Sequence, residues 1–248
     1  GLAAGLAGGG FGGLGEAQVW PMERAKEMLD KSGTCIFSMP PGFGKTACTA
    51  FQIARLGLRA LVICKREYLI NQWLGTFAKT TKINAFGWST RIANNPRKHP
   101  DWDSVDVLIA MDTSVSKAPR EFLDTVGFLA IDEAHMFCTP TGAPLFLCTH
   151  PRYIVACTAT PKREDGMHLM INRVCGENSI ALENTTPYIL YRVETPFVPY
   201  TGATKNLDWT AVTESLVTCA ERNRAIVRLA ASRARIKLLS DGDTPHHE

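Results

Sequence analysis

The sequence predicts an α/β domain with a mainly parallel, doubly wound sheet. Short apolar segments recur through the first two thirds of the 248 residues, and they lack the polar–apolar alternation of a half-exposed strand. Helix-like segments separate several of them, as in βαβ units. A glycine-rich turn that ends in Gly44, Lys45 and Thr46 follows the first apolar segment directly. Together these observations favour a domain that binds a phosphate group at one edge of its sheet.

Six apolar segments are predicted to form this sheet. They are rich in Val, Ile and Leu, residues that suit strands buried on both faces. Ligands of such sheets bind beyond the carboxyl ends of the strands, so motifs that follow different strands are expected to meet at one edge. In chain order the predicted strands are Cys35–Met39, Ala60–Cys64, Ile83–Phe86, Val105–Ala110, Phe128–Ile131 and Tyr153–Cys157.

Amphipathic segments between the strands are predicted to be helices. The polar segment 88–102 contains two prolines and is predicted to be a surface loop. Its residues Trp88 and Trp102 are expected to anchor the loop, with stacking on nucleic-acid bases as the alternative. The predicted helices are Thr46–Leu56, Glu67–Phe77, Arg120–Thr125 and Arg163–Val174.

The first strand leads into a predicted phosphate-binding loop, although Met39 occupies the position where the general pattern begins with glycine. Gly42 and Gly44 allow the backbone N–H groups to turn inward toward phosphate oxygens. The N-terminus of the following helix adds the positive end of its dipole. Lys45 supplies a charge for the β- and γ-phosphates, and the Thr46 hydroxyl can hold Mg²⁺. The residues expected to contact a nucleoside triphosphate are Pro41, Gly42, Phe43, Gly44, Lys45 and Thr46.

A second motif, Asp132-Glu-Ala-His135, follows the strand Phe128–Ile131. At a strand end the chain turns, so two adjacent carboxylates can face one site. Asp132 is predicted to hold Mg²⁺, and Glu133 to orient or deprotonate the attacking water, a division of roles that phosphoryl transfer to water requires. A solvated acidic turn is the alternative, and the nearby phosphate-binding loop disfavours it.

A third motif, Thr158-Ala-Thr160, ends the strand Tyr153–Cys157. Thr158 and Thr160 could form hydrogen bonds with the acidic motif and so respond to the bound nucleotide. Taken alone, this segment would be interpreted as a threonine-rich strand end closed by Pro161.

Composition is typical of a globular protein, with 45% hydrophobic and 21% charged residues. A net charge of +3 permits nucleic-acid binding without indicating it. None of the eight cysteines forms a C-x-x-C pair, which predicts a reduced, intracellular protein. Cys138, Cys148 and His150 match no usual zinc spacing, so incidental residues are favoured there. No apolar run reaches transmembrane length, so we expect no membrane partner.

The pattern changes after about residue 181. Ile189–Thr195 is predicted to be extended, Leu207–Arg235 to be helical with Asp208 as its N-cap, and Arg235–Ser240 to be a further strand. That strand would have no partner, so we expect the chain to stop just after a second domain begins. The expected regions are a flexible glycine-rich N-terminus (1–17), a nucleotide-binding domain (18–195), and a linker with the start of a second domain (196–248).

The ordered set of a Gly-Phe-Gly-Lys-Thr loop, Asp-Glu-Ala-His and Thr-Ala-Thr resembles motifs I, II and III of superfamily 2 helicases. Pro161-Lys-Arg-Glu-Asp-Gly166 resembles a segment of the XPB-like branch, which includes phage and large-DNA-virus helicases. Leu61-Val-Ile-Cys-Lys-Arg66 followed by Asn71-Gln-Trp73 resembles motif Ia and the helix that follows it. Glu221-Arg-Asn-Arg-Ala-Ile-Val227 resembles the helix that opens the second lobe. The resemblance spans roughly residues 34–240 and implies a RecA-like ATPase lobe followed by the start of another.

The resemblance also implies roles for individual residues. Lys45, Asp132 and Glu133 would be catalytic, with ATP and Mg²⁺ as cofactors, and Thr46 and Asp132 would hold the metal. Coupling of hydrolysis to movement would involve His135, Thr158 and Thr160. The backbone of DNA, or of RNA, would lie near Lys65, Arg66, Thr113, Ser114 and Arg163, and such contacts position a strand without recognising its sequence. A solvated turn is the alternative for Lys65 and Arg66.

Two features depart from the family pattern. Gln18 is available upstream, but Trp20-Pro-Met-Glu-Arg-Ala25 lacks the glutamine expected for adenine recognition. Motifs IV to VI, including the arginine that stabilises the transition state from the second lobe, do not occur in these residues. The sequence therefore predicts an ATP-dependent DNA helicase or translocase lobe that turns over slowly by itself. The alternatives are a DEAH-type RNA helicase and a nucleotide-binding switch or scaffold that does not translocate.

Overall fold

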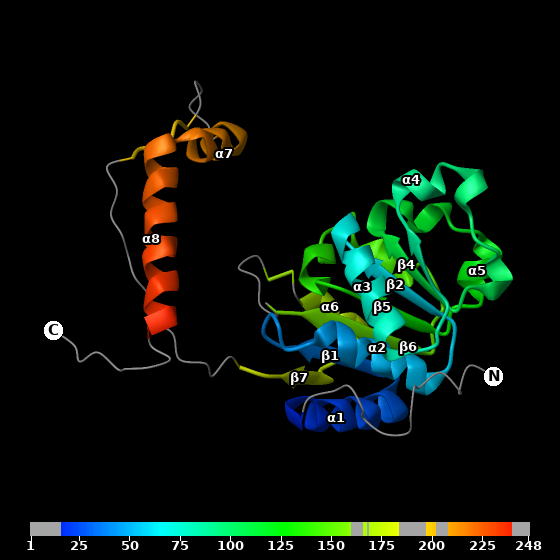
Figure 1. The fold of residues 1–248 in the computed structure, drawn as a ribbon. Coiled ribbons are helices and arrows are strands. Elements are labelled where there is room, and N and C mark those ends of the chain that lie inside the picture. Colours follow the sequence, from blue (N-terminus) through cyan, green and yellow to red (C-terminus); the bar gives the residue numbers. More distant parts are fainter. Residues whose placement is uncertain (1–15, 160–165, 168, 184–196, 202–207, 240–248) are drawn as a thin grey trace. The chain divides into compact units, whose positions relative to one another are not determined.

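The computed structural model describes residues 16–159, 166–167, 169–183, 197–201 and 208–239. The chain divides into two compact units, residues 1–185 and 186–248 (Figure 1). The predicted boundary between Thr195 and Pro196 lies outside the described residues, as does the predicted extended segment Ile189–Thr195.

The first unit contains a sheet whose seven described strands are all parallel, in the order β3-β4-β2-β5-β6-β1-β7. All six predicted strands form, each within two residues of its expected bounds. The short strand β7 was not predicted, because only its central residue Ile180 is buried and its apolar signal is weak. The strands are β1 (Thr34–Ser38), β2 (Ala60–Cys64), β3 (Ala85–Trp88), β4 (Val107–Met111), β5 (Phe128–Ile131), β6 (Tyr153–Thr158) and β7 (Ser179–Ala181).

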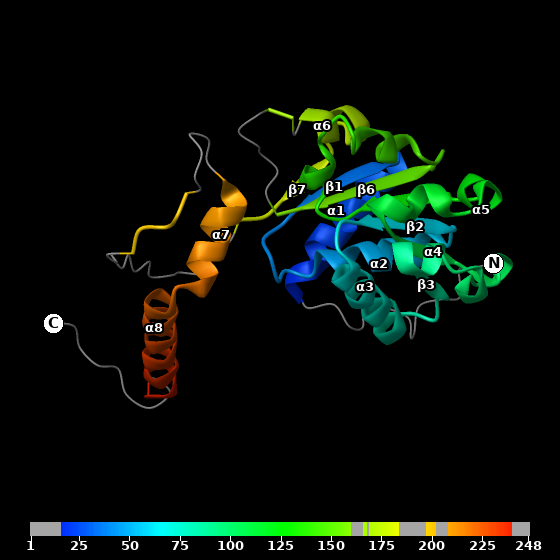
Figure 2. The ribbon, with the colours of Figure 1, turned by 90° about the horizontal axis from the view of Figure 1, so that it is seen from above.

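Helices cover both faces of the sheet, which confirms the doubly wound α/β fold (Figure 2). One face packs against α1 (Glu16–Ser32), α2 (Lys45–Leu56) and α3 (Glu67–Thr80), and its core includes Phe37, Trp73 and Phe77. The other face packs against α5 (Arg120–Asp124) and α6 (Leu169–Cys175), with Ile63 and Phe137 in its core. Helix α1 was not predicted, and its first two residues lie in the region expected to be flexible.

Short helical turns connect several elements. They are η2 (Pro96–Lys98), η3 (Trp102–Ser104), η4 (Asp112–Lys117), η5 (Ala134–Phe137), η6 (Ala143–Leu147) and the one-turn helix α4 (Thr90–Ala93). The predicted loop 88–102 is thus partly ordered by short helices. Trp88 is fully buried, and its ring meets the Trp102 ring edge-on with 5.1 Å between centroids. Its indole N–H donates to the Ser114 carbonyl at 2.8 Å, so Trp88 anchors this segment.

The second unit contains α7 (Trp209–Thr218) and α8 (Ala220–Leu239). The single helix predicted here is broken at Cys219, whose backbone is extended. Asp208 caps α7 as predicted, because its Oδ1 accepts hydrogen bonds from the Thr210 and Ala211 amides at 2.9 and 3.2 Å. The strand predicted from Arg235 is wrong: the chain stays helical to Leu239, since this arginine-, lysine- and leucine-rich segment favours a helix. No described helix has both the length and the apolar character needed to cross a membrane.

Candidate nucleotide-binding and active site

Three neighbouring strands bring the three predicted motifs to one edge of the sheet. Strand β6 pairs with β5 on one side and with β1 on the other. Ser38 at the end of β1 is in register with Thr158 at the end of β6, and Ile131 at the end of β5 is in register with Ala156. The segments that follow these strands therefore start at the same carboxyl edge.

The phosphate-binding loop closes at the N-terminus of α2, as predicted. Gly44 adopts the left-handed conformation at φ 98°, and a Cβ atom there would collide with the Gln18 side chain. The left-handed backbone favours glycine at this position, whereas the flexible Gln18 side chain could move away from a Cβ atom. The Lys45 ammonium donates to the carbonyls of Met39 at 2.8 Å and Pro40 at 3.3 Å, which holds it at the mouth of the loop. The free N–H groups of the first turn of α2 favour an anion here.

A pocket of about 440 Å³ lies between this loop, the acidic motif and α3. Its loop residues are Pro41, Gly42, Gly44, Lys45, Thr46 and Ala47, and its other residues are Tyr68, Leu69, Gln72, Thr76, Asp132 and Glu133. Of the predicted triphosphate contacts, only Phe43 does not line it. The Phe43 carbonyl instead accepts a hydrogen bond from Gln18 Nε2 at 2.6 Å, which ties α1 to the loop.

Asp132 is buried at the end of β5, with 7% of its surface exposed. Its Oδ2 accepts a hydrogen bond from the Trp73 indole N–H at 2.9 Å, and its Oδ1 accepts one from the Glu133 amide at 3.0 Å. Burial raises the pKa of the Asp132 carboxyl, while these two hydrogen bonds and the Lys45 charge oppose that rise. The side chain is thus oriented by α3 as well as by its own strand.

Glu133 has an unusual backbone. At φ 50° and ψ 50°, it is the only non-glycine residue with positive φ in the described part of the chain. Such a conformation costs on the order of 1–3 kcal/mol and is concentrated at functional sites. It turns the chain directly after Asp132, so both carboxylates line one pocket.

His135 connects the acidic motif to β6. Its Nδ1 lies 2.9 Å from Thr158 Oγ1 and 3.5 Å from Glu133 Oε2. The hydrogen bond that the sequence suggested between Thr158 and the acidic motif is therefore present. Thr160 and Arg163 fall outside the described residues.

The oxygen atoms of the pocket suit a magnesium ion. Asp132 contributes a carboxylate and Thr46 a hydroxyl to the same pocket, and Mg²⁺ prefers such hard oxygen ligands. Burial raises the pKa of Asp132 because it disfavours the charged form of the carboxyl group. A nearby cation would stabilise that charged form.

The residues predicted to contact nucleic acid lie after β2 and β4, which are adjacent in the sheet. Lys65 forms an ion pair with Asp112 and lies 5.4 Å from the Phe137 ring centroid. Arg66 and Thr113 are exposed. Ser114 is completely buried, and its hydroxyl donates to the Trp88 carbonyl at 2.7 Å. It is a packing residue of this unit, so the prediction for Ser114 is wrong.

The sequence does not predict the contacts that two residues make at the site. Gln18 was considered only for adenine recognition, and nothing near it in the sequence indicates contact with the loop 25 residues later. Trp73 was assigned only to a helix after motif Ia, yet it donates to Asp132, which is 59 residues away. A fully buried Trp needs a partner for its N–H, and this requirement is the signal that points to such a contact.

The chain is similar to viral proteins that carry helicase names. The chain is 29% identical over 190 residues to the 109L protein of Invertebrate iridescent virus 3, which carries a helicase name; the match covers 74% of the chain and 56% of that protein. It is 26% identical over 172 residues to QP509L of African swine fever virus, which carries an ATP-dependent RNA helicase name, covering 67% of the chain and 33% of that protein. The chain thus spans about half or less of these relatives.

A solved structure has the same fold. The SWI2/SNF2 ATPase core of Sulfolobus solfataricus, solved with double-stranded DNA, matches 66% of the chain and 36% of its own length with a TM-score of 0.54 at 17% identity. A family profile described as "Type III restriction enzyme, res subunit" matches residues 14–163, which include the phosphate-binding loop and the acidic motif. The chain therefore belongs to the type III restriction enzyme res subunit family.

Proposed function

We propose that this chain is the ATP-binding and hydrolysing lobe of a nucleic-acid helicase or translocase, with DNA as its polymer. The observation that carries the proposal is that Lys45, Asp132 and Glu133 line one pocket at the carboxyl edge of the sheet. The helicase names of viral relatives support it.

The residues of the pocket divide the work of phosphoryl transfer to water. The loop N–H groups and the Lys45 ammonium bind the phosphate chain of ATP. Thr46 and Asp132 would hold Mg²⁺, which when bound neutralises charge on the phosphate oxygens. Glu133 accepts a proton from the attacking water and orients it. The carboxylate is about one-third exposed, so water reaches it without a conformational change.

Movement would be linked to hydrolysis through His135. Its ring contacts both Glu133 and Thr158, so a change at the water-activating carboxylate passes to the end of β6. Thr160 is a further predicted coupling residue. The sugar–phosphate backbone would cross the sheet edge near Lys65, Arg66 and Thr113, with Arg163 as a further predicted contact. We assign ATP binding to residues 18–195 and the start of the second lobe to residues 196–248. The arginine of that lobe would complete the active site.

Substitutions in the intact protein test this assignment. Lys45→Ala should lose nucleotide binding, and Glu133→Gln should bind ATP but hydrolyse it at least about 100-fold more slowly, the range typical of general base removal. Glu177→Gln, an exposed glutamate outside the pocket, is the matched control and should hydrolyse normally. Hydrolysis that survives Glu133→Gln would refute the assigned base.

RNA is the alternative to DNA as the polymer. QP509L, to which the chain is 26% identical, carries an RNA helicase name, so an RNA polymer is the second candidate. Matched DNA and RNA strands added to an ATPase assay separate the two, since the true polymer should stimulate hydrolysis more. If neither polymer stimulates ATP hydrolysis and the protein displaces no strand, the nucleotide-binding switch becomes the better proposal.

A further inference from the structure

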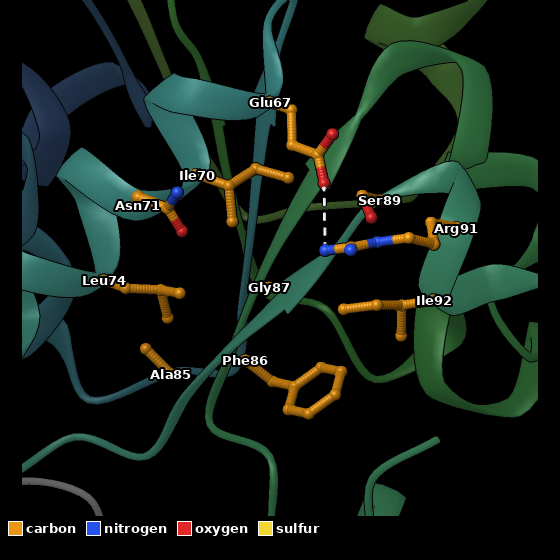
Figure 3. Close-up of a pocket in the computed structure, with 10 residues that line it drawn as sticks. All are labelled: Glu67, Ile70, Asn71, Leu74, Ala85, Phe86, Gly87, Ser89, Arg91 and Ile92. Atoms are coloured by element: carbon orange, nitrogen blue, oxygen red, sulfur yellow. Dashed lines mark ion pairs between the residues drawn. The ribbon is translucent and has the colours of Figure 1, made fainter. Parts of the chain in front are cut away.

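A second pocket, of about 630 Å³, lies between α3 and α4 above the strand β3 (Figure 3). It shares no lining residue with the nucleotide pocket. Both pockets use α3, but Tyr68, Leu69 and Gln72 face the nucleotide pocket, whereas Ile70 and Leu74 face the second one. The two pockets therefore lie against different sides of the same helix.

Much of the wall of this second pocket is apolar. Ile70 and Leu74 contribute from α3, Phe86 from β3, and Ile92 from α4, and Figure 3 shows these side chains around the strand. Gly87 lets the helix approach, because a Cβ atom there would lie 2.6 Å from Ile70 Cγ2. Apolar walls of this kind, in a cavity of several hundred Å³, are typical of pockets that bind a small group.

The wall also includes a residue whose polar side-chain atom lacks a partner among the described residues. Ser89 is 3% exposed, and its Oγ has no hydrogen-bond partner among the described residues. A buried hydroxyl without a partner destabilises the folded protein, so such groups call for an explanation. The Asn71 amide, exposed on α3, is a further donor and acceptor at this pocket. The Oγ has almost no accessible surface in this structure, so a ligand in the pocket would reach the Ser89 hydroxyl only after that side chain turns toward it.

The charges at the mouth of the pocket balance. Arg91 extends from α4 toward Glu67 on α3, with 3.7 Å between Nη2 and Oε1 (Figure 3). Both side chains are more than half exposed, so this ion pair is weak and can open. Balanced charge favours a neutral ligand over a phosphate, and the Glu67 carboxylate opposes an anion directly.

The mouth of the pocket adjoins the predicted path of the nucleic-acid backbone. Arg66 directly precedes Glu67, and Thr90, which lies between Ser89 and Arg91, has its hydroxyl 3.1 Å from that of Thr113. A backbone that contacts Arg66 and Thr113 would pass the opening of the pocket. A group attached to that backbone could then enter.

We propose that this pocket receives one unstacked base of the bound strand. A base is neutral and planar, with apolar faces for Ile70, Leu74 and Ile92 and a polar edge for Ser89 and Asn71. The inference rests on the proposed function, since it supplies the strand from which the base comes. It adds a contact with bases to a surface otherwise predicted to hold only phosphates.

The test compares two single strands of equal length in the intact protein: a fluorescein-labelled oligonucleotide with bases, and the same strand built from abasic sites. Deoxy and ribo versions are both measured by anisotropy. The unmodified protein should bind the base-bearing strand roughly 5- to 100-fold more tightly, the range for burying one base. Leu74→Trp fills the pocket and should reduce this ratio to about 1 by weakening only the base-bearing strand. Ala78→Trp, on an exposed turn of α3 outside the pocket, should keep the ratio.

Ser89→Ala provides a second variant that needs no added bulk. Removing an unpaired hydroxyl should raise the melting temperature of the free protein by a few degrees. It should also lower the preference for the base-bearing strand by roughly 3- to 10-fold, because the hydrogen bond to the base is lost. A purely structural serine would show no change in that preference.

The outcomes are separable. Equal affinity of the unmodified protein for both strands, or an unchanged affinity ratio in Leu74→Trp, would overturn the base pocket. The helicase proposal would remain intact in that case. The pocket would then suit an apolar protein side chain. If neither strand binds and neither stimulates ATP hydrolysis, the proposed function and the base pocket both fail.

Discussion

Trp73→Phe would test how α3 controls the acidic motif. The substitution keeps an aromatic ring beside Phe77 but replaces the bicyclic indole with a single phenyl ring, which carries no N–H. Asp132 Oδ2 then loses a donor at 2.9 Å in a site where the carboxylate is buried. We expect two consequences: lower stability, and weaker orientation of the carboxylate that would hold Mg²⁺.

A matched control isolates the hydrogen bond. Trp88 is also fully buried, but its indole N–H donates to the neutral carbonyl of Ser114 at 2.8 Å. Hydrogen bonds to charged groups contribute about 1.5–3 kcal/mol, against about 1 kcal/mol for neutral pairs. Trp88→Phe removes the same ring atoms, so the packing losses largely cancel. Trp73→Phe should therefore reduce the free energy of unfolding by about 1 kcal/mol more than Trp88→Phe.

The second readout is the magnesium dependence of nucleotide binding. Removing a group that orients a metal ligand typically weakens metal affinity about 10- to 100-fold. A fluorescent ADP analogue titrated at increasing Mg²⁺ should thus require roughly that much more metal in Trp73→Phe than in Trp88→Phe. Urea unfolding measures the stability difference on the same samples.

Two results would refute this reasoning. If both variants lose equal stability, the carboxylate does not depend on the indole donor. If the magnesium requirement of Trp73→Phe matches that of Trp88→Phe, Asp132 is oriented by its own strand and by the Glu133 amide alone.

Three other predictions concern local features. Because Glu133 has φ 50°, Glu133→Gly should be more stable than Glu133→Ala by about 1 kcal/mol in the free energy of unfolding. In a thermal scan it should therefore melt at the higher temperature, and the reverse order would exclude backbone strain. Asp208→Ala should destabilise α7 by about 1 kcal/mol, seen as faster amide exchange in its first turn, whereas Asp208→Asn should exchange at the native rate. Burial raises the pKa of Cys35, Cys64 and Cys175 from near 9 to about 12, so the unfolded chain releases these protons first. Stability should then fall between pH 9 and 12 by about 1.4 kcal/mol per pH unit for each thiol, and Cys175→Ala should show a shallower fall in urea unfolding; an identical slope would contradict the assignment.

Much of the fold follows from local pattern. The six predicted strands form because runs such as Leu61–Ile63 are apolar on both faces, which only a covered parallel strand satisfies. The errors lie where that signal is weak. Arg235–Leu239 contains apolar residues typical of a strand, yet it extends a helix already formed by its neighbours. Residues 16–32 form α1 although glycine-rich sequence precedes them and Pro21 lies inside the helix.

The chemistry of the site was predictable where it is contiguous. The residues from Pro41 to Thr46 and from Asp132 to His135 each form a short segment whose residue types match one step of phosphoryl transfer. Ser114 was misplaced because its sequence neighbours suggest an exposed turn, while its hydroxyl bonds to a strand 26 residues earlier.

Sequence therefore specified which groups this protein can use: a lysine, a threonine, two carboxylates and a histidine, each in a segment that follows an apolar strand. Tertiary structure decided which of them meet. Strand β6 lies between β5 and β1, so segments nearly 90 residues apart form one pocket, and the Trp73 donor reaches Asp132 from another helix. The reason is physical: residue types and local turns depend on neighbours within a few positions, whereas strand order and the partners of buried polar groups depend on how the whole core packs.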